Sequence, residues 1–406
     1  MKLTDITNNI NEWFNGTGPL ADIVISSRIR LARNLADYKF LSRCSNTEKT
    51  EILIKLKDTL MMMDLGDSVF YISIDNAPPL DRNCLVERHL ISRHHAFGKG
   101  PRGAVIAERE SFTAMINEED HLRLQVLRGG LQLSACAEHI NRIDDMLEEK
   151  VDYAFSPRYG YLTACPTNVG TGIRVSVMLH LPALKMTNQT DKLFNAARAM
   201  NLAVRGLFGE GTDAAGDFYQ LSNQVTLGIC EAEIIQQLEK TIIPEIVEYE
   251  NQARRQLLAK DTDILDDKIS RAMALLKNAH LISSQEALFL LSHLRLGINM
   301  HDRMGASTPA IEQLCKLTDT ADKTGCLSIS TINRLFMLTL PAHLQINYGK
   351  ELDPTHRDAL RAHITRQALN QENSYPRLHA KMAQFAGVFK YMKPAIITLT
   401  PCQKRS

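Results

Sequence analysis

The chain has 406 residues, enough for two or three domains, and 44% of them are hydrophobic, which excludes a largely disordered protein. Its 47 lysines and arginines are balanced by 46 aspartates and glutamates, so the total charge does not indicate nucleic acid as a partner, and any anion site must be local. The eight cysteines are scattered without a CxxC pair or a zinc-ligand spacing, as is typical of reduced thiols. A polar N-terminal sequence and the lack of an apolar run of about 18 residues predict a soluble, cytoplasmic protein.

Short strand-like runs alternate with helical stretches up to about residue 225. β-Branched and aromatic residues bounded by Gly, Pro, Asn and Asp predict strands over 22–26, 69–74, 104–108, 112–117, 174–179, 202–208 and 218–222. Helices are predicted over 47–63 and about 120–149, although Gly129 and Gly130 weaken the second.

Helical spacing dominates after residue 227. Apolar residues recur every three or four positions over 231–260, where Pro244 is expected to kink or split the helix. Further helices are predicted over 265–279 and 285–296, with Ser283 and Glu286 as a capping box for the second. We therefore expect an α+β domain followed by an α-helical domain, with the boundary near 230–260 and no flexible linker.

Arginines with alternating spacing mark the predicted strand that includes residues 25–33. A period of two places Ser26, Arg28 and Arg30 on one face. Two guanidinium groups on one face repel each other, so an anion between them, gripped by the planar arginine fork, is one explanation. A solvent-facing strand whose arginines pair with carboxylates is the other.

Three further arginines, Arg123, Arg174 and Arg205, lie in segments otherwise rich in apolar or small residues. Each alone is more typical of a structural ion pair, but together with the first two they could converge on a polyphosphate. The sequence contains no P-loop, no strand-to-helix GxGxxG and no HRD or DFG motif. A phosphate site built mainly from arginine side chains is the interpretation that remains.

Two carboxylate-bearing segments accompany these arginines. Glu118, Glu119 and Asp120 follow a predicted strand, and Glu210 lies between two glycines. A carboxylate can hold a guanidinium group by two parallel hydrogen bonds and accept a proton from it as it attacks phosphorus. Alternatively, these acidic segments are solvated, or they cap a helix that begins near His121.

A cysteine and a histidine cluster complete the candidates. Cys165, before Pro166, is either a reactive thiol near a cationic substrate or an inert buried one. His89, His94 and His95 lie within seven residues, but their separations do not match a two-histidine metal site on a helix. A surface role or a polar contact to a nucleotide is favoured.

Near the C-terminus, Asp353 and Pro354 predict the start of a helix. Arg357 and Arg361 are then one turn apart, a like-charge pair whose repulsion a bound phosphoryl group would relieve, with Asp358 available to grip a guanidinium group. An ordinary exposed amphipathic helix is the alternative.

Six segments resemble the phosphagen (guanidino) kinase superfamily, and their amino-acid sequences are most similar to those of the bacterial protein-arginine kinases. The similarity extends over about residues 1–370 in unbroken order. The segments are SSRIRLARN at 26–34, LVERHLIS at 85–92, INEEDHLRLQ at 116–125, YLTACPTNVGTGIRVSVM at 161–178, VRGLFGEGT at 204–212 and QLSNQVTLG at 220–228.

This resemblance implies a guanidino-kinase-type catalytic domain over 1–255, a curved, mostly antiparallel sheet flanked by helices that binds ATP with Mg²⁺. It implies a helical domain over 256–372 with an RDxxRA motif for phosphoarginine binding and allosteric activation, and leaves 373–406 as an extension of unknown role. The catalytic residues carried over by motif are Glu119, Glu210 and Cys165. Nucleotide binding is implied for Ser26, Ser27, Arg28, Ile29, Arg30, His89, Arg123, Arg174, Val175, Ser176, Val177, Met178, Arg205, Gly206, Leu207, Phe208 and Gly209. Phosphoarginine binding is implied for Arg357, Asp358, Arg361 and Ala362.

The reaction that the resemblance implies is ATP-dependent phosphorylation of arginine side chains in proteins. Glu210 is expected to be the main base and Glu119 the orienting group, and Mg²⁺ is expected to be held by phosphates and water rather than by a protein cage. Phosphagen kinases carry a helical domain before the SSRIR motif, which here begins at Ser26, so we expect an open site that admits an arginine on another protein.

The same resemblance implies a homodimer, a zinc-finger activator protein, a Clp-type unfoldase–protease that receives the modified proteins, and a stress-gene repressor as one substrate. Neither nucleic acid nor a membrane is expected as a direct partner. Two rival functions remain at this point. One is a kinase that phosphorylates free arginine, and the other is a non-catalytic module that binds phosphoarginine.

Overall fold

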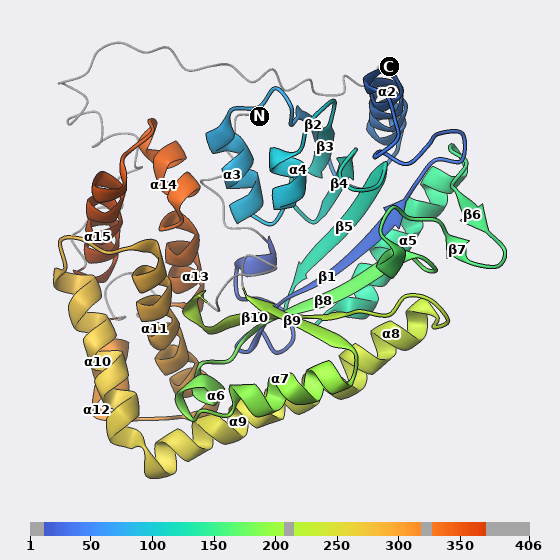
Figure 1. Ribbon diagram of the computed structural model, residues 1–406. Helices are drawn as coiled ribbons and strands as arrows, with labels where there is room; N and C mark the ends of the chain where they lie inside the picture. The colour runs from blue at the N-terminus through green and yellow to red at the C-terminus, as the bar shows by residue number, and fades with distance from the viewer. Residues whose placement is uncertain (1–11, 207–214, 318–326, 371–406) are drawn as a thin grey trace.

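The computed structural model describes residues 12–206, 215–317 and 327–370. Its centre is an eight-stranded sheet in the order β2-β3-β4-β5-β1-β8-β10-β9, in which every neighbouring pair is antiparallel (Figure 1). The strands are β1 (Val24–Arg33), β2 (Val69–Ser73), β3 (Gly103–Ala107), β4 (Phe112–Ile116), β5 (Leu122–Gly129), β8 (Ile173–His180), β9 (Leu202–Gly206) and β10 (Phe218–Asn223). A separate small hairpin pairs β6 (Phe155–Ser156) with β7 (Gly160–Tyr161).

The predicted strands are all present within a few residues, but one predicted helix is wrong. Residues 120–149 form strand β5 and then helix α5 (Leu133–Glu148), not one long helix. Leu122, Leu124 and Val126 are buried at a spacing of two, which is the period of a strand, and the Gly129-Gly130 pair separates the two elements. The suggestion that Glu118–Asp120 cap a helix near His121 is therefore also wrong.

One face of the sheet carries the main hydrophobic core. Helices α2 (Asn46–Met62) and α5 pack on it, and residues from neighbouring strands such as Ile29, Val126 and Val175 lie opposite one another in register. The other face is covered at the β2–β4 end by α3 (Pro79–Glu87) and by α14 (Pro341–Tyr348) from the C-terminal part, which form a second, smaller core. Beyond this cover, over β5, β1 and β8, that face carries the arginines.

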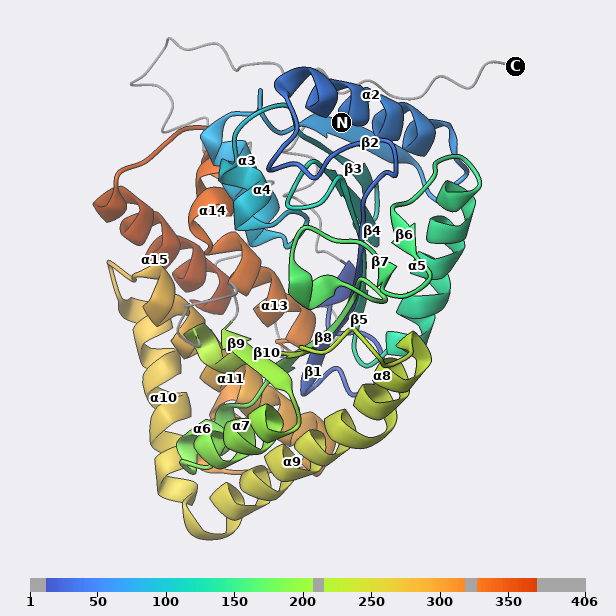
Figure 2. The ribbon, with the colours of Figure 1, turned by 45° about the vertical axis from the view of Figure 1, so that its right-hand side comes forward.

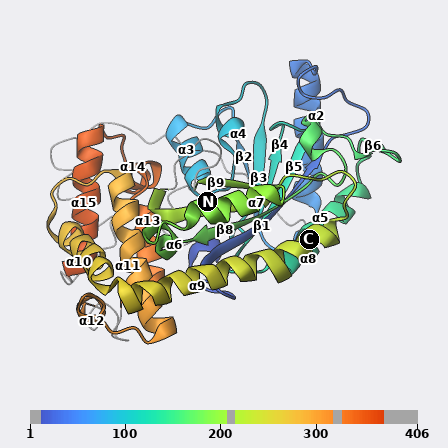
Figure 3. The same cartoon turned by 60° about the horizontal axis from the view of Figure 1, so that its bottom comes forward.

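Three shorter helices precede strands β3 and β9, and two more link the sheet to the C-terminal helices. These elements are α4 (Arg93–Phe97), α6 (Pro182–Met186), α7 (Thr190–Ala199), α8 (Glu231–Gln237) and α9 (Ile243–Lys260). Pro244 is the second residue of α9, and a π-helical turn, Leu238–Ile242, joins α8 to α9 with helical backbone throughout. The helix is therefore irregular just before Pro244, but it continues through this point. Figure 3 shows α9 running beneath the sheet towards the C-terminal helices.

The C-terminal part is entirely helical among the residues described and stands beside the β9–β10 end of the sheet (Figure 2). Its remaining helices are α10 (Thr262–Asn278), α11 (Ser284–Met304), α12 (Pro309–Lys316), α13 (Ile329–Leu338) and α15 (Pro354–Asn370). The Ser283 hydroxyl accepts a hydrogen bond from the Glu286 N–H, which is one of the two bonds of the predicted capping box, and α11 runs well beyond the predicted end at residue 296. Within the described ranges, the helices are too short or too polar to cross a membrane.

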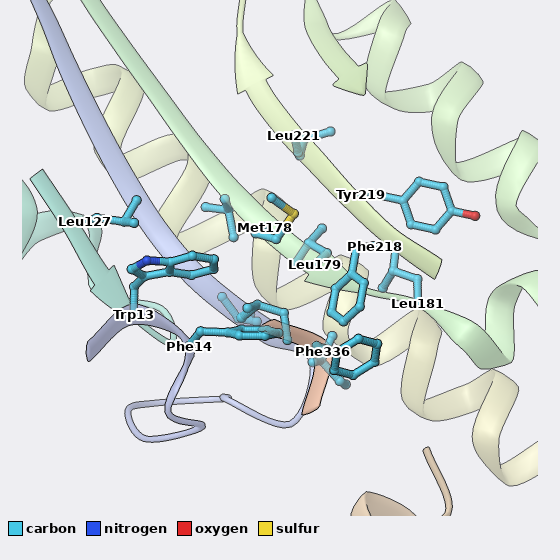
Figure 4. Packing of buried hydrophobic residues seen from close by; sticks show 14 of the residues in the cluster. Trp13, Phe14, Leu127, Met178, Leu179, Leu181, Phe218, Tyr219, Leu221 and Phe336 are labelled. Atoms are coloured by element: carbon cyan, nitrogen blue, oxygen red, sulfur yellow. The ribbon is translucent and has the colours of Figure 1, made fainter. Parts of the chain in front are cut away.

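Aromatic side chains join the helical part to the sheet. Phe14 of the 3-10 turn Glu12–Phe14, Phe218 of β10 and Phe336 of α13 meet with ring centroids 5.1–6.2 Å apart (Figure 4). The buried guanidinium of Arg295 on α11 adds hydrogen bonds of 2.7 and 2.8 Å to the carbonyl oxygens of Ala21 and Asp22, just before β1. The two parts are thus packed and hydrogen-bonded together around the start of the central strand.

Candidate active site

Five arginines gather on the uncovered face of the sheet. Arg28 and Arg30 lie on β1, and in register Arg30 faces Arg174 of β8 on one side and Gln125 of β5 on the other. Arg123 of β5 and Arg205 of β9 complete the set. Like charges directly opposite one another destabilise a sheet, so an unliganded face of this kind costs folding free energy. We call these residues (Arg28, Arg30, Arg123, Arg174 and Arg205) the pocket arginines.

The electrostatics of this face favour the binding of an anion. Burial, together with the charges of Arg174 and Arg123, lowers the pKa of Arg28 to about 10. Burial and the charge of Arg28 hold the pKa of Arg30 well below its ordinary value, and the buried Nε of Arg30 has no hydrogen-bond partner among the described residues. A polyanion would relieve this repulsion and fill the unused donor.

The acidic loop after β4 holds one of these arginines in place. Glu118 is buried; its carboxylate lies 2.6 Å from Nη1 of Arg123 and accepts a 2.5 Å hydrogen bond from the Ser92 hydroxyl. Burial opposes ionisation of Glu118, but the charge of Arg123 and the Ser92 hydrogen bond outweigh it and lower the pKa of this carboxyl. Glu119 contacts Nη2 of Arg123 at 2.9 Å, and its side chain is 39% exposed at the pocket, so it is the carboxylate available to a ligand.

Asp120, the third acid of the loop, connects it to the segment that carries Cys165. Its Oδ1 accepts hydrogen bonds from Asn34 Nδ2 at 2.7 Å and from the Ala164 N–H at 2.6 Å. Cys165 then begins the short 3-10 turn Pro166–Asn168, with its Sγ 3.0 Å from the Thr167 hydroxyl. The three neighbouring acids therefore make different contacts. Glu118 fixes Arg123, Glu119 faces the pocket, and Asp120 holds the segment that carries Cys165.

A pocket of about 570 Å³ lies between these groups. It brings together the predicted residues Arg30, Glu119, Arg123, Cys165, Arg174 and Arg205. Its wall also includes residues that the sequence reasoning did not assign to the site, which are Ala32, His94, Glu118, Thr167, Asn168, Gly172 and Gln224. All of these residues except His94 lie inside the six segments that resemble the family. Their position in those segments is the sequence feature that could have predicted them.

A second, much smaller cavity adjoins the arginine face. It is lined by Arg28, Ser26, Ser176, Met178 and His89, which are all among the residues predicted for nucleotide binding. Trp13 closes it, with its ring edge-on to His89 at 5.1 Å. Burial and the charge of Arg28 lower the pKa of His89 to about 3, so this imidazole is neutral at physiological pH.

Several predicted nucleotide residues do not bring their side chains to the pocket. Ile29, Val175 and Val177 belong to the core on the α2 and α5 face, because a strand alternates its side chains between faces. Ser27 also points away and bonds to the Gly130 carbonyl at 2.8 Å. Gly206 is buried at the end of β9. The remaining assignments, Leu207, Phe208, Gly209 and Glu210, lie outside the described residues.

The RDxxRA segment lies on α15, far along the chain. Asp353 caps the helix by accepting the His356 N–H at 3.1 Å, as predicted. Arg361 is 1% exposed and donates to the carbonyl oxygens of Thr339 and Ile282 at 2.7 and 2.8 Å, and to Asp358 at 2.6 Å. Ala362 is buried behind it, whereas Arg357 and Asp358 are partly exposed. Asp358 thus holds an arginine of this chain.

The pocket carboxylates that the structure describes bond to arginine rather than forming a cluster of metal ligands. Among the described residues, no group of three or more His, Cys, Asp or Glu side chains is placed to hold a metal ion. Glu118 and Glu119 both contact Arg123 instead. A divalent cation would fit this pocket together with the phosphates that it accompanies.

The comparisons with known proteins agree with this geometry. The model of the ATP:guanido phosphotransferase C-terminal catalytic domain matches residues 51–253, and that of the protein-arginine kinase McsB C-terminal domain matches 262–322 and 323–380. The protein-arginine kinase of Halothermothrix orenii is 45% identical over 371 residues, covering 91% of this chain and 100% of the relative, and that of Symbiobacterium thermophilum is 42% identical over 364 residues, covering 89% and 97%. The structure of the duplicated taurocyamine kinase from Schistosoma mansoni with transition state analog components shares the fold, with a TM-score of 0.52 and 24% identity over 61% of this chain and 35% of that chain.

An antiparallel sheet whose open face gathers arginines around a carboxylate defines the class of ATP:guanidino phosphotransferases, and the expected fold class is confirmed. Within that class, the chain belongs to the protein-arginine kinase family, because it is 39–45% identical to curated members over about nine tenths of its length.

Proposed function

We propose that this protein transfers the γ-phosphoryl group of ATP to arginine side chains of other proteins. The observation that carries the proposal is the pocket in which Arg30, Arg123, Arg174 and Arg205 converge beside the half-exposed carboxylate of Glu119. Arg28 lines the smaller cavity beside it. The membership of the protein-arginine kinase family supports a protein arginine, rather than a free guanidino compound, as the acceptor.

The pocket arginines supply the electrostatic part of the reaction. In our proposal Arg28, with Ser26, Ser176 and His89, contacts the nucleotide in the smaller cavity, and Arg30, Arg174 and Arg205 hold the polyphosphate in the larger one. Phosphoryl transfer depends mainly on positioning and on neutralising charge around phosphorus, which is what fixed guanidinium groups do. Mg²⁺ would arrive with the nucleotide and neutralise further phosphate charge.

The acceptor guanidinium must lose a proton as it attacks. A guanidinium nitrogen forms the new N–P bond, the bond from phosphorus to the bridging oxygen of ADP breaks, and the proton passes to a carboxylate. Glu119 is proposed to orient the acceptor, since its side chain reaches the pocket while Glu118 fixes Arg123 behind it. Glu210 is proposed as the main base, and Cys165, at the pocket wall, as a contact to the acceptor.

The RDxxRA segment is proposed to bind phosphoarginine and to regulate activity. The partly exposed Arg357 and Asp358 would make the direct contacts, while Arg361 and Ala362 hold α15 in place. A test is titration with free phosphoarginine. Binding that Arg357→Ala abolishes and that Arg366→Ala, at a neighbouring partly exposed position, leaves intact would support the assignment.

The motif resemblance also supports a set of biological proposals. We propose a cytoplasmic homodimer, activated by a zinc-finger protein, that marks proteins such as a stress-gene repressor for a Clp-type protease. Sedimentation velocity of the purified chain tests the dimer, and degradation of a phosphorylated substrate by the reconstituted protease tests the marking.

The decisive experiment for the activity is mass spectrometry at neutral pH, because the P–N bond is acid-labile. Purified protein is incubated with Mg-ATP and a disordered model protein, and in a parallel tube with free arginine. Phosphoarginine on the protein alone supports the proposal, whereas phosphorylated free arginine alone would assign a small-molecule kinase. No product in either tube, even with the activator added, would favour a non-catalytic phosphoarginine-binding module. Glu119→Gln is the matched control that should remove the product.

A further inference from the structure

A buried contact joins the C-terminal helical part to the helix behind the smaller cavity. The carboxylate of Glu87, in the last turn of α3, accepts hydrogen bonds from the backbone N–H groups of Ala342 and His343 at 2.8 and 3.0 Å, at the start of α14. The same carboxylate lies 2.9 Å from Nδ1 of His343. Residues more than 250 positions apart in the chain are therefore held together by one acid.

The other side of the His343 ring contacts Arg88. Nη1 of Arg88 lies 3.1 Å from Nε2 of His343, and a guanidinium group can only donate, so Nε2 must carry the lone pair. The ring proton is then on Nδ1, where it is donated to Glu87. Burial lowers the pKa of His343, which agrees with this neutral tautomer. The imidazole is completely buried and bridges Glu87 and Arg88.

Arg88 immediately precedes His89, the residue that lines the smaller cavity. Its Nε donates to Glu110 at 2.7 Å, so Glu110 and His343 both hold the guanidinium. His89 itself has a φ of +58°, a left-handed conformation that costs a non-glycine residue of order 1 kcal/mol and persists only where the surroundings impose it. Its carbonyl is held by Gln125 Nε2 at 2.8 Å.

We infer that His343 is a positioning residue for nucleotide binding, acting through Arg88 on the left-handed turn that presents His89 beside Arg28. The inference rests on the proposed function, since the smaller cavity is taken to be part of the nucleotide site. The helical part then does more than add a regulatory surface, because one of its side chains helps to shape the catalytic part from behind.

The two nitrogens of His343 have separable tasks, and this makes the inference testable. In His343→Asn, an amide near the Nδ1 position can still donate to Glu87, but nothing reaches Arg88. In His343→Gln, the longer amide can accept from Arg88, while Glu87 keeps its two backbone N–H partners. A purely structural role would make both variants differ from the wild type in stability alone.

The chain provides its own reporter for the experiment. Trp13 is the single tryptophan of the sequence and lies edge-on to His89, so its fluorescence should respond to nucleotide. Titration with Mg-ATP gives the affinity, and steady-state kinetics with a protein substrate separates KM for ATP from kcat. Asn299→Ala is the matched control, because it removes a different contact between the helical part and the sheet, the 3.1 Å hydrogen bond from Asn299 on α11 to the Asp22 carbonyl oxygen.

Loss of one hydrogen bond to a charged group should weaken ATP binding about tenfold in His343→Asn, with kcat within about twofold of wild type. His343→Gln and Asn299→Ala should bind ATP within about twofold of wild type. Arg88→Lys, which cannot bridge Glu110 and His343 together, should reproduce the His343→Asn result and serves if that variant folds poorly.

The inference is overturned if His343→Asn and Arg88→Lys bind ATP as the wild type does. It is equally overturned if His343→Asn, His343→Gln and Asn299→Ala all weaken binding in proportion to their loss of stability. Failure of the wild type itself to bind ATP would contradict the proposed function, and the inference would fall with it.

Discussion

Two groups of arginines in this protein differ in what surrounds their guanidinium groups. The pocket arginines face one another across the open side of the sheet, and the pKa values of Arg28 and Arg30 are lowered by burial and by their neighbours' positive charges. The interior arginines are almost fully buried and are bonded to acids, carbonyl oxygens and other polar groups of the protein. The interior arginines are Arg33, Arg88, Arg254, Arg295 and Arg361.

The contrast is sharpest within one strand. Arg30 and Arg33 are three residues apart in the same motif, yet they lie on opposite faces of β1. Arg33 bonds twice to Asp144, at 2.6 and 3.0 Å, and its guanidinium stacks 3.6 Å above the Tyr161 ring. Within this strand, Arg33 is structural because the fold provides its counter-charge, whereas Arg30 faces the pocket with its buried Nε unbonded among the described residues.

The largest expected effect is on activity, from removing one pocket arginine. Arg30→Met should lower kcat/KM about 10³-fold, because a guanidinium aimed at the transferring phosphoryl group is lost. The same change should raise the free energy of unfolding without ligand by about 1 kcal/mol, since it removes repulsion across the sheet. Steady-state kinetics and urea unfolding measure the two. A variant that is both inactive and clearly less stable would contradict the comparison.

The matching change in an interior arginine should act in the opposite way. Arg33→Met leaves Asp144 buried without its partner and should lower the free energy of unfolding by about 3–5 kcal/mol. Urea unfolding of the apo protein is the measurement. The double variant Arg33→Met, Asp144→Leu should recover a substantial part of this loss, and no recovery would mean that Arg33 does not act through Asp144.

A smaller effect is expected from an acid that serves the pocket indirectly. Glu118→Gln keeps the shape of the side chain but removes the charge that fixes Arg123, so kcat/KM should fall about 10- to 100-fold. Glu239→Gln, which alters a carboxylate bonded to Ser134 at the other side of the molecule, is the matched control and should leave kcat/KM unchanged. Equal losses in both variants would show that the effect is not local to the pocket.

The smallest expected effects are on the free energy of unfolding at acid pH. They come from buried histidines, which unlike both groups of arginines are neutral in the folded protein at pH 7. Burial lowers the pKa of His95 and His293 to about 4, whereas an unfolded histidine titrates near 6.5. Above pH 7 both states are neutral; as the pH falls below 6.5 only the unfolded state gains protons, so stability falls. Each residue should account for about 2 kcal/mol of loss between pH 7 and pH 5.

Urea midpoints at pH 7, 6 and 5 measure this slope. His95→Gln combined with His293→Gln should make the decline shallower. An unchanged slope in the double variant would show that other groups dominate the acid response.

Sequence patterns sufficed for much of the fold and for the centre of the site. Alternation in β1 placed Arg28 and Arg30 on one face, and the family-like segments brought Arg123, Arg174, Arg205, Glu119 and Cys165 to one pocket, as the structure has them. Local sequence patterns do not show which distant segments pair with one another in the sheet. Leu122–Gly129 was assigned to a helix because its alternation is short and its pairing with β1 and β4 lies outside the segment.

The same limit applies to individual side chains. Nothing near Ser27 in sequence indicates that its hydroxyl bonds to Gly130 on the far face, more than a hundred residues away. Arg361 reads as a ligand-binding residue beside Arg357, yet Thr339 and Ile282 supply the carbonyl oxygens that bury it. These roles depend on groups from other elements, so they follow only from the folded chain.

The central claim is that the pocket arginines form a polyphosphate site whose counter-charge is supplied by ATP. The most direct test is urea unfolding of the wild type and of Arg30→Met, each with and without Mg-ATP. Mg-ATP at 100 times its dissociation constant should stabilise the wild type by about 2.7 kcal/mol. Arg30→Met should start more stable than the wild type and gain almost nothing at the same nucleotide concentration. Equal stabilisation of both proteins by Mg-ATP would contradict the claim.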